Sequence, residues 1–200
     1  MSARLEATRA IYRRWIRLYA SVAALVLGAS TVAGFLLGSA VPIDALPTAE
    51  GGGTGPFPPL TTVDLAVNNL VAMVALSLGA VSLGLITLLG LVLNGLLIGA
   101  VVGIAVQQVD PLVVAMLIVP HGVLEIPALL VASAVGLRFA WLTVRYIRGL
   151  EETLVTRRDL REAGGLLLFS ALLIVVAAYI EANLTLELAE AVAGGEIVAA

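Results

Sequence analysis

The sequence predicts an all-α membrane protein: a polytopic bundle of about five transmembrane helices plus one cytoplasmic amphipathic helix, in a single domain. Three observations support this fold class. Of the 200 residues, 60% are hydrophobic and only 12% are charged, which is too apolar for a soluble domain of this size. The apolar residues form runs long enough to cross a bilayer. The basic residues, all of them Arg, flank these runs in two clusters, as cytoplasmic anchors do.

The first predicted span covers residues 16–38, a length that suits one crossing. The Arg-rich start also resembles a signal peptide, but the apolar run exceeds the usual length of about 7–15 residues, so we expect an uncleaved helix. Residues 39–62 are rich in Gly and Pro and contain no basic residue. They are expected to form an extracytoplasmic loop.

The stretch 63–110 is almost continuously apolar. As one helix it would be roughly 70 Å long, more than twice the thickness of the hydrocarbon core. It therefore predicts two spans, 64–84 and 86–107. Their turn is expected near Leu83–Ile86, where Gly84 eases a tight reversal.

The fourth predicted span is 111–137, and the fifth is 164–182. Between them, the Arg-rich segment 138–161 is expected to form an amphipathic helix at the cytoplasmic interface. Five crossings that begin inside return the chain to the cytoplasm at this segment and leave the acidic tail outside. The charge pattern therefore predicts a multi-pass protein of the cell membrane with a cytoplasmic N-terminus and an extracytoplasmic C-terminus.

Six polar residues fall inside or at the ends of the predicted spans, where each unpaired polar group is costly. They are Asn68, Asn69, Asn94, His121, Glu125 and Glu181. His121 and Glu125 are four residues apart, so they share one helix face. Counting depth along straight spans places Asn68, Asn69 and Glu181 in an outer layer, with Asn94, His121 and Glu125 nearer the middle.

Three residues predict a helix break around the His–Glu pair: Pro120, Gly122 and Pro127. The sequence leaves open whether the segment is a kinked helix, two half-helices or a re-entrant loop. Five glycines predict close packing between helix backbones because they recur every fourth residue. They are Gly34 and Gly38 in the first span, and Gly95, Gly99 and Gly103 in the third. Packing within one chain and between chains both remain open.

No metal, cofactor or catalytic residue is expected. His121 is the only His in a chain without Cys, so the second His of a His-Glu-x-x-His zinc motif is missing. An intramembrane hydrolase would need a metal whose ligands are completed by Glu125, Glu181 or another subunit. The simpler role for the polar residues is to stabilise helix packing through hydrogen bonds between helices. The alternative is a site for an ion, a proton or a small ligand.

Several of these residues occur in motifs that resemble the stage II sporulation protein M family, from about residue 20 to 185. The run Pro-His-Gly-Val-Leu-Glu-Ile-Pro-Ala at 120–128 is the most specific. The others are Asn68-Asn69, Asn94-Gly95 with Gly99, Gly136-Leu137-Arg138, and residues 177–182. The resemblance implies a polytopic membrane protein. The family member that gave the name acts in engulfment, where it holds cell-wall hydrolases and has no known enzymatic activity.

We therefore expect a non-enzymatic membrane scaffold or interaction protein. Its expected partners are the lipid bilayer and either other proteins or further copies of the chain, and no nucleic acid. The alternative is a small channel or transporter that uses the intramembrane His121–Glu125 site.

Overall fold

The computed structural model describes residues 2–42 and 61–193, and it is helical throughout apart from turns and short connections. Five helices are long and apolar enough to cross a membrane. They are α2 (Tyr19–Ser39), α3 (Thr62–Ser77) with the short helix η3 (Leu78–Ala80), α4 (Leu85–Ala105), α5 (Pro111–Ile147) and α6 (Arg157–Asn183). The predicted fold class, a polytopic membrane helix bundle, is confirmed. Most of the predicted loop 39–62 lies outside the described residues.

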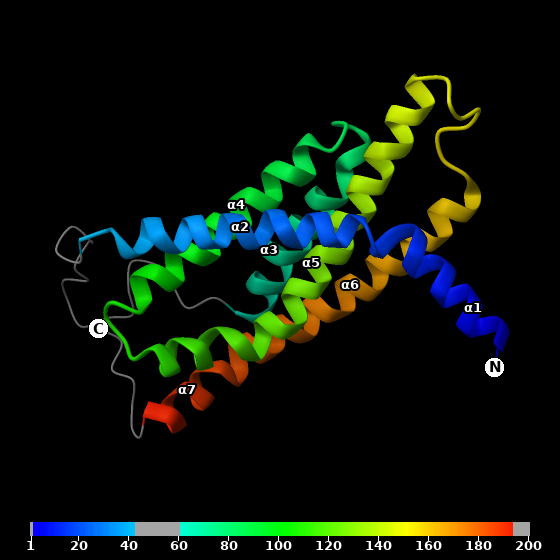
Figure 1. Cartoon of the computed structure of the whole chain (residues 1–200). Coiled ribbons are helices and arrows are strands. Elements are labelled where there is room, and N and C mark those ends of the chain that lie inside the picture. The colour runs from blue at the N-terminus through cyan, green and yellow to red at the C-terminus, as the bar shows by residue number, and fades with distance from the viewer. Residues whose placement is uncertain (1, 43–60, 194–200) are drawn as a thin grey trace.

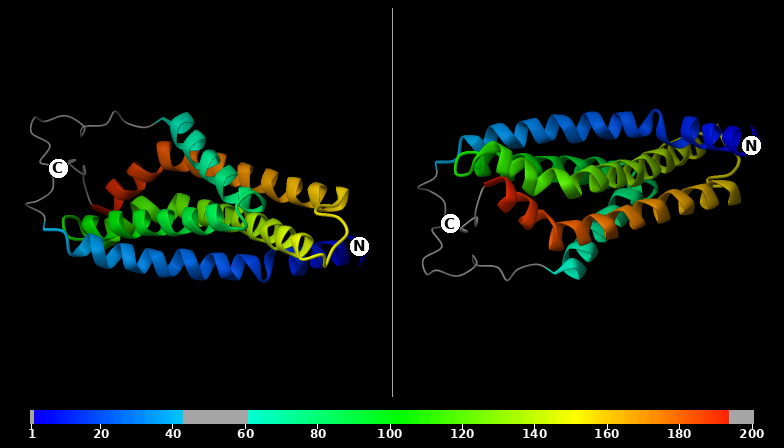
Figure 2. Two further views of the ribbon diagram at one scale, coloured as in Figure 1. Left: turned by 90° about the horizontal axis from the view of Figure 1, so that it is seen from above. Right: turned by 90° about the horizontal axis from the view of Figure 1, so that it is seen from below.

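Two short helices lie at opposite ends of the bundle (Figure 1). α1 (Ser2–Ile11) precedes a π-helical turn, η1 (Tyr12–Ile16), that leads into α2, and α7 (Thr185–Ala193) follows α6. Figure 2 shows α2, α4, α5 and α6 running along the bundle between these two ends, while α3 crosses it obliquely. The end that carries α1 also holds the connection from α5 to α6.

The turn between α3 and α4 occupies residues 81–84, and the sequence analysis placed it near Leu83–Ile86. Leu83 and Gly84 adopt φ values of 52° and 93°, in the left-handed region where Gly has no steric penalty. The Thr87 hydroxyl donates to the Leu76 carbonyl oxygen at 2.8 Å across the turn, in a fully buried position. This bond satisfies a carbonyl near the end of α3 and fixes the reversal.

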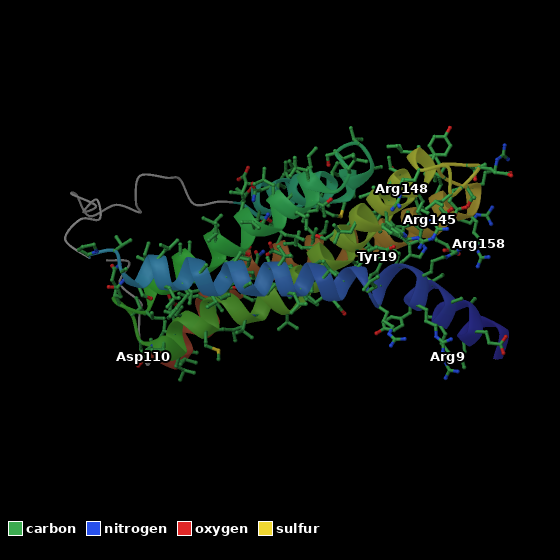
Figure 3. All side chains as sticks on the ribbon, turned by 45° about the horizontal axis from the view of Figure 1, so that its top comes forward. Arg9, Tyr19, Asp110, Arg145, Arg148 and Arg158 are labelled. Atoms are coloured by element: carbon green, nitrogen blue, oxygen red, sulfur yellow. The ribbon has the colours of Figure 1, made fainter. Side chains whose placement is uncertain are left out.

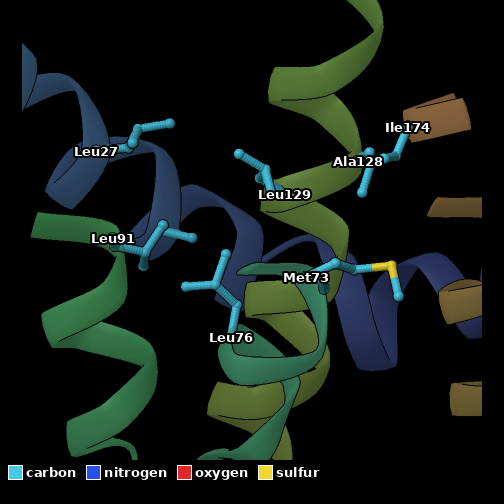
Figure 4. Packing of buried hydrophobic residues seen from close by; sticks show 9 residues of the cluster. Leu27, Met73, Leu76, Leu91, Ala128, Leu129 and Ile174 are labelled. Atoms are coloured by element: carbon cyan, nitrogen blue, oxygen red, sulfur yellow. The ribbon is translucent and has the colours of Figure 1, made fainter. Parts of the chain in front are cut away.

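All five long helices contribute to one apolar core (Figure 4). Its buried members are Ala23, Leu27, Met73, Leu76, Leu91, Ala128, Leu129, Ala132 and Ile174. A shared core of this kind joins the five helices into one packing unit.

Helices α2 and α4 pack through their backbones at the five glycines. A Cβ on Gly34 or Gly38 would overlap the carbonyl oxygen of Leu96 or Ala100 on α4. The residues that a Cβ on Gly95, Gly99 or Gly103 would overlap belong to α2 and are Leu27, Ser30, Thr31, Phe35 and Ser39. Packing within the chain therefore uses both glycine faces. In lipid, such close approach gives dispersion contacts that larger residues prevent.

The predicted helix break is wrong, because Pro120, Gly122 and Pro127 all lie inside the single helix α5. Each Pro removes only one backbone donor from a helix of 37 residues, and the turns on either side continue. Figure 1 shows that α5 curves while it runs along the bundle. The segment therefore forms neither two half-helices nor a re-entrant loop.

The amphipathic helix predicted for 138–161 is also absent. Residues 138–147 extend α5, residues 148–156 form the connection, and α6 begins at Arg157. Arg residues were expected to stop the span at the membrane surface. Instead, Arg138 turns toward the bundle, where its guanidinium lies 4.6 Å from the centre of the Trp15 ring, so the helix continues past it.

Candidate functional site

Three ionisable side chains from two helices meet near the end of α6. His121 and Glu125 come from α5, Glu181 comes from α6, and one nitrogen or oxygen atom from each lies within 4.8 Å of the other two. All three residues are half-buried. Two carboxylate oxygens at this separation repel by roughly 3 kcal/mol or more at an effective dielectric constant of about 20. Two carboxylates this close therefore favour a positively charged partner between them.

The antiparallel pairing of α5 and α6 explains why Glu181 joins the pair. Glu125 lies 22 residues before Ile147, the end of α5, and Glu181 lies 24 residues after Arg157, the start of α6. At 1.5 Å per residue both are about 33–36 Å from the connection. The two-layer arrangement from the sequence is thus wrong for Glu181, because it ended the fourth span at residue 137.

The three asparagines make other contacts. Asn68 donates to Asn69 at 3.2 Å on the exposed side of α3, and Asn94 donates to the Gly90 carbonyl oxygen of its own helix at 2.8 Å. Nearby, Asn183 donates to the Thr62 hydroxyl at 3.2 Å and links the end of α6 to the start of α3. Sequence reasoning did not select Asn183, because it follows the predicted span.

A second polar cluster, centred on Glu162, ties the start of the chain to α6. Its carboxylate accepts hydrogen bonds from Trp15 Nε1 at 2.7 Å and from Arg158 Nε at 2.9 Å, and it pairs with Arg14. Trp15 is fully buried, and its ring meets the ring of Phe139 edge-on at 5.3 Å. These contacts anchor η1 to both α5 and α6.

Arg138 extends this cluster across the bundle. One guanidinium nitrogen donates to the Arg14 carbonyl oxygen at 3.0 Å, and another lies 3.5 Å from a carboxylate oxygen of Asp159. Asp159 also closes a capping box with Thr156 at the start of α6. Sequence reasoning treated the arginines as surface anchors and missed this role. The i+4 pair Arg158–Glu162 was the available signal.

Seven exposed arginines, including Arg158 of the Glu162 cluster, give this end of the molecule a basic surface. Figure 3 shows Arg148 and Arg158 at the end where α5 and α6 connect, with Arg9 on the adjacent α1, while Asp110 lies at the other end. Of the acidic groups at this end, Asp159 and Glu162 are engaged by Arg138 and Arg14, and Glu151 pairs with Arg145. Glu6 and Glu152 are exposed near the arginines. The exposed arginines, which we call the basic platform, are Arg9, Arg13, Arg17, Arg148, Arg157, Arg158 and Arg161.

The fold and these clusters define a polytopic α-helical membrane protein with ionisable residues inside its bundle. The family model of stage II sporulation protein M matches residues 23–186, and the chain belongs to that family. A protein of Methanocaldococcus jannaschii, named only as uncharacterised, is 32% identical over 134 residues, which are 66% of this chain and 72% of that protein. No solved structure matches the chain.

Proposed function

We propose that this protein is a non-enzymatic membrane scaffold that holds a partner protein at its basic platform. The observation that carries the proposal is the anchoring of η1 by Glu162, Trp15 and Arg138. This anchoring holds the exposed arginines of α1 and η1 beside those of α6 and of the connection that follows α5. A preorganised basic surface suits an acidic partner, because little side-chain and backbone order must be gained on binding.

The proposed orientation places the basic platform in the cytoplasm and α7 outside. The support is the positive-inside rule, since both Arg clusters belong to one end of the bundle. Five spans are consistent with termini on opposite sides. The partner is therefore a cytoplasmic protein or the cytoplasmic part of another membrane protein.

In-cell photo-crosslinking tests this proposal. A photoreactive residue at Glu152, exposed between Arg148 and Arg157, is expected to give one discrete adduct with a different protein. Replacing Arg148 and Arg157 by Gln should reduce that adduct at least tenfold, because long-range attraction and charge-assisted contacts are lost. The same probe at exposed Glu187, on α7 at the other end, is the control and should not give that adduct.

Adducts with lipid or with a second copy alone, unchanged by the double substitution, would contradict the scaffold proposal. The rival function is a small channel or transporter, and the specific observation in its favour is the His121–Glu125–Glu181 cluster. A liposome flux assay separates the two. The scaffold proposal expects no flux of protons, common cations or small anions, with the wild type equal to His121→Ala. Flux that His121→Ala abolishes in a folded protein would favour the transporter.

A further inference from the structure

The His121–Glu125–Glu181 cluster has nearly the dimensions of a metal site. Its three candidate ligand atoms lie within 4.8 Å of one another. A tetrahedral ion with bonds of about 2.0–2.2 Å holds its ligand atoms roughly 3.4 Å apart. The atoms must therefore approach by at most about 1.5 Å. Side-chain rotation of the two flexible Glu residues provides a movement of that size.

His121 supplies a second, independent observation. Its Nδ1 atom is buried and has no hydrogen-bond partner within the part of the chain that the structure describes. Buried polar atoms are nearly always paired, so an unpaired nitrogen on a ring that lies beside two carboxylates indicates a missing partner. A metal bound directly to this nitrogen would supply the missing partner. If the metal binds the other ring nitrogen instead, a water or carboxylate that it orders would supply the partner.

The charge of the cluster also suits a divalent cation. Glu125 and Glu181 together carry two negative charges when ionised, in surroundings that solvate them poorly. The labelled arginines Arg145, Arg148 and Arg158 lie at the other end of the bundle (Figure 3) and cannot neutralise them. One divalent ion neutralises both carboxylates.

The donor set narrows the choice of metal. One imidazole nitrogen with two carboxylate oxygens is typical of first-row transition ions such as Zn²⁺, Mn²⁺ or Fe²⁺. Mg²⁺ and Ca²⁺ prefer sites made of oxygen alone, and Cu⁺ prefers sulfur. Three protein ligands would leave one position for water or a further ligand.

We propose that His121, Glu125 and Glu181 bind one divalent first-row transition-metal ion, which clamps α5 to α6. From the sequence, Glu125 and Glu181 were only ligands that an intramembrane hydrolase would require, and the meeting of α5 with α6 is what brings Glu181 to the His121–Glu125 pair. The site goes beyond the scaffold role, since it lies at the other end of the bundle from the basic platform.

The test titrates chelator-treated, full-length protein in lipid nanodiscs with Co²⁺ and follows its visible absorption. One Co²⁺ per chain is expected, displaced by Zn²⁺. Glu181→Gln and His121→Ala should each weaken binding by about 100-fold or more. Glu187→Gln, which changes an exposed carboxylate on α7, is the matched control and should bind like the wild type. Size exclusion and circular dichroism establish that each variant is folded.

Excess Zn²⁺ should also raise the Tm of the wild type and of Glu187→Gln but not that of Glu181→Gln, because only a binding-competent native state gains stability. If His121→Ala does not fold, Glu181→Gln alone decides the question. No saturable binding of Zn²⁺ or Co²⁺ by the wild type would overturn the proposal. So would equal affinities for the wild type and a folded Glu181→Gln.

Discussion

Replacing Gly99 by Val is expected to destabilise the protein by about 3 kcal/mol or more, with a fall in Tm of roughly 6–12 °C. A Cβ at this position would overlap the Thr31 carbonyl oxygen and lie 2.6 Å from the Phe35 nitrogen. Both atoms belong to the backbone of α2, so no side chain can rotate away. The two helices must separate, and their dispersion contacts weaken along the whole glycine face.

Gly28→Val is the matched control for Gly99→Val. Gly28 lies on α2 itself, and a Cβ there would meet nothing within 4 Å. Thermal unfolding in one detergent should therefore separate the two variants clearly. Equal Tm values for Gly28→Val and Gly99→Val would show that α2 and α4 do not pack through these backbones.

Replacing Glu162 by Gln is expected to loosen the Arg-rich end by about 2 kcal/mol, because Arg14 and Arg158 lose their shared counter-ion and Arg14 is partly buried. Gln keeps the volume of the side chain, so the effect reports charge. The start of the chain should detach from α5 and α6 more often. Trypsin should then cleave after Arg14 and Arg17 about 30-fold faster, because a local opening free energy that is lower by about 2 kcal/mol raises the population of the cleavable state by that factor.

The control for Glu162→Gln is Glu152→Gln, which removes an exposed carboxylate from the nearby connection. Its cleavage rate should match that of the wild type, since exposed charges contribute little to stability. A cleavage rate for Glu162→Gln that also matches the wild type would mean that η1 is held by the burial of Trp15 alone.

Hydrophobicity and length were sufficient to predict the five spans, because a bilayer requires about 20 apolar residues for each helix. The close packing at the glycine faces was also predictable, since a four-residue repeat of small residues on a membrane helix is typical of close contact between helix backbones. The α2–α4 pairing itself was not predictable. The same repeat suits packing against another copy of the chain, and only the three-dimensional arrangement assigns it to this one.

The errors around α5 share one cause. Pro120, Pro127 and Arg138 were interpreted by their local preferences, which disfavour a continuous helix in the membrane. Tertiary contacts outweigh these preferences, as Arg138 shows by turning onto Trp15. Because the true end of α5 is Ile147, the register against α6 shifts and brings Glu181 beside Glu125. That register depends on helix ends, which local sequence defines poorly.

The register of α5 against α6 places Glu125 beside Glu181, and cysteine crosslinking measures that register directly. The chain contains no Cys, so engineered pairs give no background. Glu125→Cys with Glu181→Cys should crosslink in membranes with a short bifunctional thiol reagent. Glu125→Cys with Tyr179→Cys should not, because Tyr179 is exposed on another face of α6. Crosslinking of the second pair in preference to the first would contradict the α5–α6 register and the site built on it.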